Sequence, residues 1–457
     1  MNRKVPLLIL VVVLLAGAFF SARWLIQTLI VPPPAQSATA DPAHLRIGEA
    51  FLDHLDAGRY DQALAMTTPE VQEGLANGKL QEVWEALPKQ LGARQSRSAL
   101  RGEIVAGTPV VTSTLAFGMM ALDARIVVQA DGRISGFRVV PAAAPVAEPA
   151  ALESNAHFSE SDFLVGEGER ALPGTLSLPI GDGPFPAIVL VHGSGLHDRD
   201  ESIGPNKPFR DMAHALAERG IAVLRYEKRS KVRPQDFASG DFTVDEEVTD
   251  DAVAAVAQLR ADARIDPARV FVAGHSLGAM MAPRIAQRAP ELAGLILLAA
   301  PARPLQDIVA EQVNYLAARD GQISEDEQAG IDDVIAKVAA VEVLDAATPA
   351  TDTLLGLPPR YWMDLRGYDP VETARTLPQA MLIVQGGRDY QVTRDGDFVR
   401  WEAAFDDEPR VQFALHSALN HLLIAGEGVP GPEEYAIEGR VDAAVIADIA
   451  AFVGAAR

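Results

Sequence analysis

The spacing of apolar residues divides the chain into two parts of different structure. From about residue 151 onward, short apolar runs alternate with segments in which apolar residues recur every three or four positions. The runs predict buried strands and the segments predict amphipathic helices. We expect strands at 174–178, 187–191, 222–225, 270–273, 295–298, 381–384 and 411–415, with helices such as 209–218, 248–259 and 279–288 between them. This alternation is typical of an α/β fold, in which helices cover both faces of a mostly parallel sheet.

Residues 41–141 begin with helical spacing and continue with strand-like alternation. Apolar residues from Ile47 to Leu55 and from Leu80 to Leu91 recur at helical intervals. Strands are then expected at 99–105, 110–117, 121–129 and 134–140, and Asp131-Gly132 is a hairpin signal between the last two. The pattern predicts a small α+β domain, which resembles the cone-shaped domains related to nuclear transport factors. Because it contains no cluster of catalytic residue types, we expect a spacer or an oligomerisation module.

The first 31 residues have the pattern of an export signal or a membrane anchor. Arg3 and Lys4 precede two apolar stretches, at 5–20 and 24–31. Positive charge before an apolar span keeps the N-terminus inside and sends the rest of the chain across the membrane. We therefore expect an extracytoplasmic protein, periplasmic or at the cell surface, which residues 1–31 anchor to the inner membrane. A cleaved signal peptide and a secreted protein are the alternative. Residues 32–40 and 142–150, rich in Pro and Ala, are expected linkers.

Charge and cysteine content exclude several classes of function. The formal net charge is -22. A nucleic-acid partner would require a basic face, and anionic lipid head groups would be repelled, so membrane contact is expected through the N-terminal segment only. The chain contains no cysteine, which excludes disulfides, thiolate catalysis and cysteine-ligated metal sites.

The segment Gly-His-Ser-Leu-Gly, at 274–278, follows an expected strand and precedes an expected helix. In this context G-x-S-x-G forms a nucleophile elbow, a turn so tight that the serine backbone is strained and the flanking glycines are needed for space. The Ser276 hydroxyl would then lie at a helix N-terminus, where the N–H of Leu277 can stabilise an oxyanion. The alternative is an ordinary strand-to-helix turn with a capping serine. The order of the remaining motifs favours Ser276 as a nucleophile.

A second oxyanion donor is expected in His-Gly-Ser-Gly, at 192–195, directly after the strand at 187–191. We favour the N–H of Ser194, with Gly193 as the alternative. His192 is expected to hold this loop by hydrogen bonds. The following residues, 196–207, are rich in His, Asp, Arg and Asn, and either line the mouth of the site or form a solvated turn.

A nucleophilic serine needs a base, and the base needs an orienting acid. Two histidines follow Ser276, namely His416 at the end of a strand and His421 in the loop after it. We favour His421, because a loop residue can reach over the edge of the sheet. Asp389 is the expected acid, because it ends the Gly-rich turn after the strand at 381–384. Asp395 and Asp397 are interpreted as first-turn charges of the next helix.

Residues 303–376 are longer than a connection between two strands requires and predict a helical cap. Tyr361 and Trp362 lie beside prolines in this insertion. One hypothesis is that they line an apolar substrate pocket, and the other is that they belong to the ordinary core of the cap. Replacing Trp362 with Ala distinguishes the two by its effect on acyl-chain preference and on melting temperature.

From about residue 151 to the end, the chain resembles bacterial α/β-hydrolase serine esterases. The resemblance rests on GTLSLP at 174–179, HGSG at 192–195, GPNKPF at 204–209, RYEKR at 225–229, GHSLG at 274–278, GGRD at 386–389 and LNHLL at 419–423. It implies hydrolysis of a small-molecule carboxylic ester through an acyl-enzyme, without metal or cofactor, and with a neutral to mildly alkaline optimum because the base is a histidine. A serine peptidase or acyltransferase of the same fold, or an anchored non-catalytic binding protein, are the rival interpretations.

Overall fold

The computed structural model describes residues 41–75, 78–91, 94–105, 108–117, 121–142 and 152–455. The predicted signal segment and both predicted linkers lie outside these residues, apart from residue 142. No helix among the described residues is both long enough and apolar enough to cross a membrane. The described residues form two compact units that divide near residue 145.

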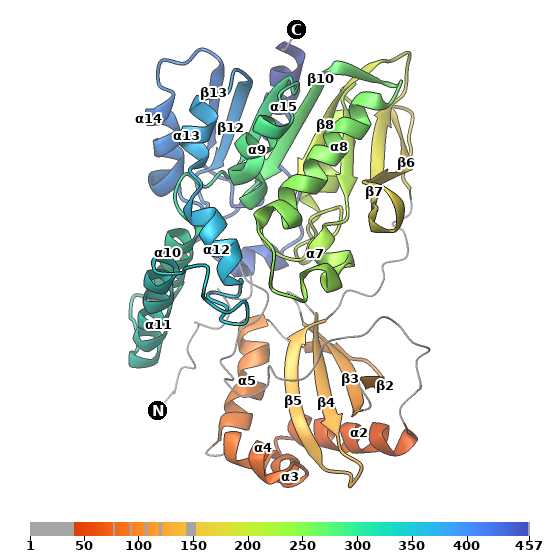
Figure 1. Ribbon diagram of the computed structural model, residues 1–457, viewed down its shortest axis with the longest axis vertical. Coiled ribbons are helices and arrows are strands. Elements are labelled where there is room, and N and C mark those ends of the chain that lie inside the picture. Colours follow the sequence, from red (N-terminus) through yellow and green to blue (C-terminus); the bar gives the residue numbers. More distant parts are fainter. Residues whose placement is uncertain are drawn as a thin grey trace. The chain divides into compact units, whose positions relative to one another are not determined.

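The smaller unit has helices first and an antiparallel sheet second (Figure 1). Its elements are α2 (Pro42–Asp56), α3 (Tyr60–Ala65), α4 (Pro69–Gly74), α5 (Lys79–Leu91), β1 (Arg94–Arg97), β2 (Arg101–Val105), β3 (Thr108–Phe117), β4 (Ala121–Val128) and β5 (Ile134–Pro141). The strand order is β1-β3-β4-β5, and β2 also pairs with β3. The expected hairpin joins β4 to β5, with Gly132 at φ +81°. Strand β1 was not expected, because its four residues are all polar.

The larger unit is built around an eight-stranded sheet with the order β13-β12-β11-β10-β8-β9-β7-β6. The strands are β6 (Phe158–Val165), β7 (Leu172–Pro179), β8 (Phe185–Val191), β9 (Ala222–Tyr226), β10 (Ile265–His275), β11 (Gly294–Leu298), β12 (Ala380–Gly386) and β13 (Val411–His416). Strands β8 to β13 run parallel to one another. At one edge of the sheet, β7 pairs antiparallel with β9, and β6 pairs antiparallel with β7. The predicted parallel sheet is confirmed. Strand β6 was not expected, because polar residues interrupt its apolar pattern at this half-exposed edge.

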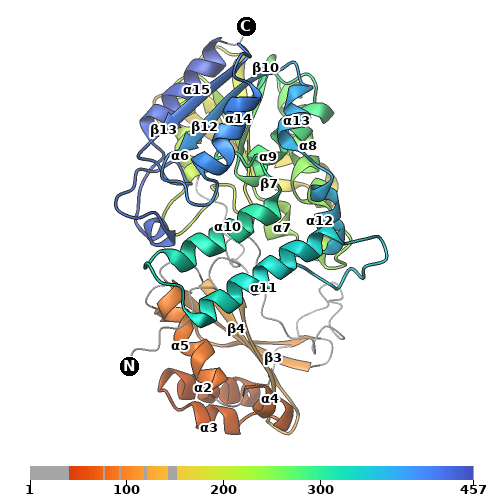
Figure 2. The ribbon, with the colours of Figure 1, turned by 90° about the vertical axis from the view of Figure 1, so that its left-hand side faces the viewer.

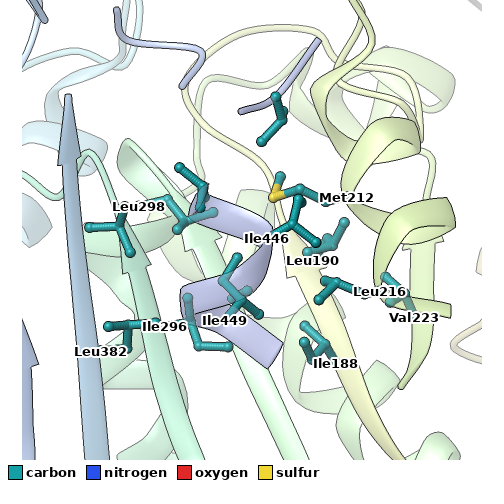
Figure 3. Packing of buried hydrophobic residues seen from close by; sticks show 14 of the residues in the cluster. Ile188, Leu190, Met212, Leu216, Val223, Ile296, Leu298, Leu382, Ile446 and Ile449 are labelled. Carbon is teal, nitrogen blue, oxygen red and sulfur yellow. The ribbon is translucent and has the colours of Figure 1, made fainter. Parts of the chain in front are cut away.

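Helices cover both faces of this sheet, as predicted (Figure 2). The α-helices of this unit outside the predicted insertion are α6 (Pro208–Ala217), α7 (Arg229–Val232), α8 (Asp250–Ala261), α9 (Leu277–Arg288), α14 (Val399–Ala404) and α15 (Ala443–Ala455). Helices α6 and α15 lie on one face, and α8 and α9 lie on the other (Figure 2). Alternate residues of the central strands, such as Ile188 and Leu190, point toward α6 and α15 and form a buried core with Met212 and Ile449 (Figure 3). Removing this apolar surface from water is the main stabilising contribution to the sheet.

The predicted insertion consists of four helices between β11 and β12. These are α10 (Leu305–Ala318), α11 (Glu325–Glu342), α12 (Pro359–Arg366) and α13 (Pro370–Arg375). Helices α10 and α11 pack against each other, and α11 contacts α12 (Figure 2). Because β8, β10, β12 and β13 are parallel, the loops that follow them meet at one edge of the sheet.

Candidate active site

Ser276 lies in the turn between β10 and α9, and its backbone has the strain expected of an elbow. Its φ is 51° and its ψ is -116°, which is unusual for a residue with a side chain. A hydrogen bond of 2.9 Å from its N–H to the carbonyl of Leu298 fixes the turn against β11. Ser276 is the N-cap of α9, so its side chain stands at the positive end of a helix.

The two glycines of the motif are required by close backbone contacts. A β-carbon on Gly274 would lie 2.2 Å from the carbonyl oxygen of Gly278. A β-carbon on Gly278 would lie 2.2 Å from the carbonyl oxygen of Val191, at the end of β8. The same close approach brings the loop after β8 to Ser276, because a β-carbon on Gly193 would lie 3.2 Å from the β-carbon of Ser276. The elbow and the HGSG loop are therefore adjacent.

The N–H groups of Gly193 and Ser194, the two alternatives in the HGSG loop, differ in their partners. The N–H of Gly193 donates a hydrogen bond of 2.7 Å to Oε1 of Glu201. Within the described part of the chain, no hydrogen bond uses the N–H of Ser194, and its Oγ is buried without a partner. Leu277 is the first residue of α9, where helix geometry provides no intrahelical acceptor for the N–H. Of the two alternatives for the loop donor, these contacts favour Ser194 over Gly193.

Asp389 and His421 are in direct contact. Oδ2 of Asp389 lies 2.7 Å from Nδ1 of His421, and both residues are buried. The Gly-rich turn allows this approach, because a β-carbon on Gly386 would lie 2.4 Å from the carbonyl oxygen of Leu419. The side chain of Asn420 accepts hydrogen bonds from the N–H groups of Leu422 and Ile424 and shapes the loop that carries the histidine.

The other candidates for base and acid have different partners. Nε2 of His416 lies 2.9 Å from Asp448 on α15. Asp395 forms an ion pair with its neighbour Arg394. Asp397, like Asp395, lies in the first turn of the helical segment Arg394–Phe398 after β12, as expected. It is 0% exposed and forms an ion pair of 2.7 Å with Arg303, which ties the start of the cap to the segment after β12.

Comparison with known proteins assigns the chain to a family. Residues 188–431 match the alpha/beta hydrolase family. The chain is also 37% identical over 400 residues to Esterase EstD of Thermotoga maritima, an alignment that covers 88% of this chain and 93% of that protein. The chain belongs to the alpha/beta hydrolase family. The prediction that it is an enzyme, a hydrolase of the esterase type, is thereby confirmed.

Two solved structures are similar to the chain at low sequence identity. An esterase from Pyrococcus furiosus is 16% identical at a TM-score of 0.41, covering 65% of this chain and 91% of that one. The 2,6-dihydroxy-pseudo-oxynicotine hydrolase is 17% identical at a TM-score of 0.37, covering 57% of this chain and 62% of that one. Residues 48–137, in the smaller unit, match a family described as a protein of unknown function, DUF3887.

A buried ion pair next to Ser276 in the sequence, between His275 and Glu201, was missed by the sequence analysis. Nδ1 of His275 lies 3.0 Å from Oε2 of Glu201, and Nε2 of His275 lies 2.9 Å from the carbonyl oxygen of His421. The contact with Glu201 is at ion-pair distance but lacks the geometry of a hydrogen bond, whereas the contact with His421 meets the hydrogen-bond distance. Burial alone would lower the pKa of His275, but the carboxylate of Glu201 raises it above its ordinary value. Burial opposes the charge of Glu201 as well, and His275 lowers the pKa of that carboxyl group to about 2.

The loop at 196–207 is not a solvated turn. Its charged residues Arg199, Asp200 and Glu201 are buried, and each forms an ion pair inside the unit. The ring of His192 holds the loop as expected, through a contact of 2.9 Å with the carbonyl oxygen of Asp198. Burial lowers the pKa of His192 to about 3, so the ring is neutral near pH 7.

Tyr361 and Trp362 lie on α12 with exposures of 0% and 1%. The hydroxyl of Tyr361 donates to Oε2 of Glu247 at 2.7 Å, and the indole N–H of Trp362 donates to the carbonyl of Leu354 at 2.6 Å. These contacts are those of packed residues with satisfied polar groups. They support the cap-core hypothesis, and a role in substrate binding stays a prediction.

Proposed function

We propose that this alpha/beta hydrolase is a serine esterase that cleaves small-molecule carboxylic esters through an acyl-enzyme. The observation that carries the proposal is the buried contact of 2.7 Å between Asp389 and His421. A serine hydroxyl becomes a useful nucleophile only beside a base whose orientation a third group fixes. The strained elbow at Ser276 and the relative named as an esterase support the same conclusion.

The proposed reaction begins with attack of Ser276 Oγ on the ester carbonyl carbon while Nε2 of His421 accepts the hydroxyl proton. Asp389 accepts a hydrogen bond from Nδ1 and stabilises the imidazolium that forms. The N–H groups of Ser194 and Leu277 bind the oxyanion of the tetrahedral intermediate. The intermediate collapses as His421 gives its proton to the departing alcohol oxygen. Water, deprotonated by His421, then attacks the acyl-enzyme. His421 returns this proton to the departing Oγ of Ser276, which releases the carboxylic acid and restores the enzyme.

The test is hydrolysis of p-nitrophenyl esters, from acetate to long acyl chains, by the full chain and by Ser276→Ala. We expect turnover by the parent and its loss in the variant at unchanged melting temperature. Ser113→Ala is the matched control, because Ser113 is a buried serine of the smaller unit and should leave turnover unchanged. Equal hydrolysis by the parent and Ser276→Ala would refute the proposal. Turnover of amides but not esters would favour a peptidase, and specific ligand binding without turnover would favour a binding protein.

We also propose that residues 1–31 place the hydrolase unit outside the cytoplasm as a membrane-anchored protein. The support is the short basic start before an apolar stretch. Fractionation of cells that express the full chain, with an alkaline-phosphatase fusion at the C-terminus, tests this. Active phosphatase in the membrane fraction is expected. Active phosphatase in the soluble extracytoplasmic fraction would indicate cleavage, and an inactive fusion would overturn the orientation.

A further inference from the structure

Lys228 is a buried lysine beside the HGSG loop. It follows β9 and is 2% exposed. Its Nζ lies 2.7 Å from the carbonyl oxygen of Gly193 and 2.8 Å from Oε1 of Glu247. A buried ammonium group is costly unless it is paired, so Glu247 compensates the charge. The second contact, with the carbonyl oxygen of Gly193 in the HGSG loop, adds nothing to this charge compensation.

The carbonyl that Lys228 binds shares a peptide group with the proposed oxyanion donor. The C=O of Gly193 and the N–H of Ser194 belong to one peptide plane. The only cis peptide among the described residues is Gly183-Pro184, so this peptide is trans. In a trans peptide the C=O and N–H point in opposite directions. An ammonium group that holds the carbonyl therefore directs the N–H of Ser194 away from Lys228.

The peptide group before it, between His192 and Gly193, is held by the negative charge of Glu201. Oε1 of Glu201 accepts the N–H of Gly193 at 2.7 Å, and Glu201 is 1% exposed. Rotation of the Gly193-Ser194 peptide would turn the N–H of Ser194 toward the ammonium of Lys228 and the carbonyl toward a developing oxyanion. Both contacts would be repulsive in a buried site, where charge interactions are only weakly screened. The two buried charges thus select one orientation of the loop.

The ammonium group also changes the strength of the donor. A hydrogen bond from a cation to an amide oxygen draws electron density from the amide and makes its N–H a better donor. The effect is available before substrate binds, because Lys228 is already in place in the described structure. A donor that is fixed in advance stabilises charge that develops only in the transition state.

We propose that Lys228 is a positioning residue of the oxyanion hole, which orients and polarises the N–H of Ser194 through the Gly193-Ser194 peptide. The proposal rests on the proposed function, because it assigns Ser194 to an oxyanion. Lys228 does not touch the reacting atoms. Its removal should therefore impair binding of the transition state and leave binding of the substrate almost unchanged.

The test compares Lys228→Met with Arg229→Met in the full chain. Arg229 is the matched control, because it is also buried and ion-paired, to Asp251, while no hydrogen bond or ion pair among the described residues joins it to the loop. The measurements are kcat and KM on a p-nitrophenyl ester, affinity for a trifluoromethyl ketone that forms an oxyanion adduct with serine, and melting temperature. We expect Lys228→Met to lower kcat by about 10²–10³-fold, as loss of one oxyanion donor does, with little change in KM. Affinity for the ketone should fall by a comparable factor.

Arg229→Met should have a lower melting temperature than the parent, while its kcat and its affinity for the ketone stay close to those of the parent. Equal kcat losses in both variants would overturn the proposal, and so would a kcat loss in Lys228→Met without weaker ketone binding. If Lys228→Met does not fold, Lys228→Gln keeps a donor without the charge. A kcat for Lys228→Gln equal to that of the parent would overturn the proposal, and a loss without a matching fall in melting temperature would support it.

The rate of labelling by a fluorophosphonate separates this proposal from the esterase proposal. Attack of Ser276 on phosphorus also develops negative charge on an oxygen, whatever the natural substrate is. If the parent hydrolyses no ester but is labelled, slower labelling of Lys228→Met than of Arg229→Met would support the role of Lys228. Equal labelling rates would overturn it even if the esterase proposal holds.

Discussion

Asp389→Asn is the most informative single substitution in the proposed triad, because the surrounding hydrogen bonds determine the orientation of the new side-chain amide. Oδ1 of Asp389 accepts the N–H groups of Gln391 and Val392 at 2.8 and 3.0 Å. Only the oxygen of the new amide can replace this acceptor. The amide NH₂ must then occupy the position of Oδ2, which lies 2.7 Å from Nδ1 of His421 and 3.3 Å from Nε2 of Gln385.

The magnitude of the effect follows from the tautomer of His421. An NH₂ group at this position donates to Nδ1, so the single proton of the neutral ring moves to Nε2. That nitrogen can then no longer accept the proton of Ser276. The analogous substitution in a serine protease lowers kcat by about 10⁴-fold, which corresponds to about 5 kcal/mol of transition-state stabilisation. Stability should fall by only about 1–3 kcal/mol, the usual effect of one altered buried hydrogen bond.

The assay is kcat and melting temperature of Asp389→Asn on the best p-nitrophenyl ester, beside Asp397→Asn. Asp397 is also fully buried and also accepts a main-chain N–H, from Ala302. Its partner is Arg303 rather than a histidine, so Asp397→Asn should lower stability without lowering kcat of the folded enzyme. If Asp389→Asn keeps more than about a tenth of the parent kcat at a similar melting temperature, the tautomer argument is refuted.

Three further predictions concern the elbow, the buried ion pair and the cap. Gly278→Ala should cost at least about 1–3 kcal/mol of stability and lower kcat as well, because its β-carbon would displace the backbone at Val191. Folding lowers the pKa of Glu201 from 4.5 to about 2, so its stabilising contribution is present above pH 4.5 and is lost as the pH falls toward 2. Glu201→Gln should therefore have a lower free energy of unfolding than the parent at pH 7. Between pH 4.5 and 2, its free energy of unfolding, measured with urea, should fall by less than that of the parent. Trp362→Ala should cost about 3–5 kcal/mol, because the side chain is 1% exposed, with acyl-chain preference unchanged.

For each of these three predictions, one experimental result would contradict the reasoning. Gly454→Ala is the control for Gly278→Ala, because a β-carbon at 454 meets no atom within 4 Å; equal stability of the two variants would contradict the close-contact argument. Parallel loss of stability with acidification in Glu201→Gln and in the parent would contradict the assignment of that loss to Glu201. Changed acyl-chain preference in Trp362→Ala at an unchanged melting temperature would restore the pocket hypothesis.

The tight turn at Ser276 and most of the α/β architecture were predictable because their causes are local. The elbow depends on contacts between residues four positions apart, such as Gly274 and Gly278, and these are visible as a motif. Buried parallel strands are apolar on both faces, so each one shows as a continuous run. Strands β1 and β6 were not predicted, because their polar residues tolerate exposure and only pairing with a neighbour makes them strands.

The sequence by itself determined the order of the chemical groups, with Ser276 before Asp389 and His421, and the elements that carry them. The tertiary structure alone decided which charges are buried and how they pair. Glu201, Lys228 and His275 sit among polar residues in the sequence and have the same local pattern as solvated loops. Their contacts with Gly193 and His421 join segments that lie far apart in the chain. Burial of a charge depends on the partner that compensates it, and only the folded chain brings that partner within reach.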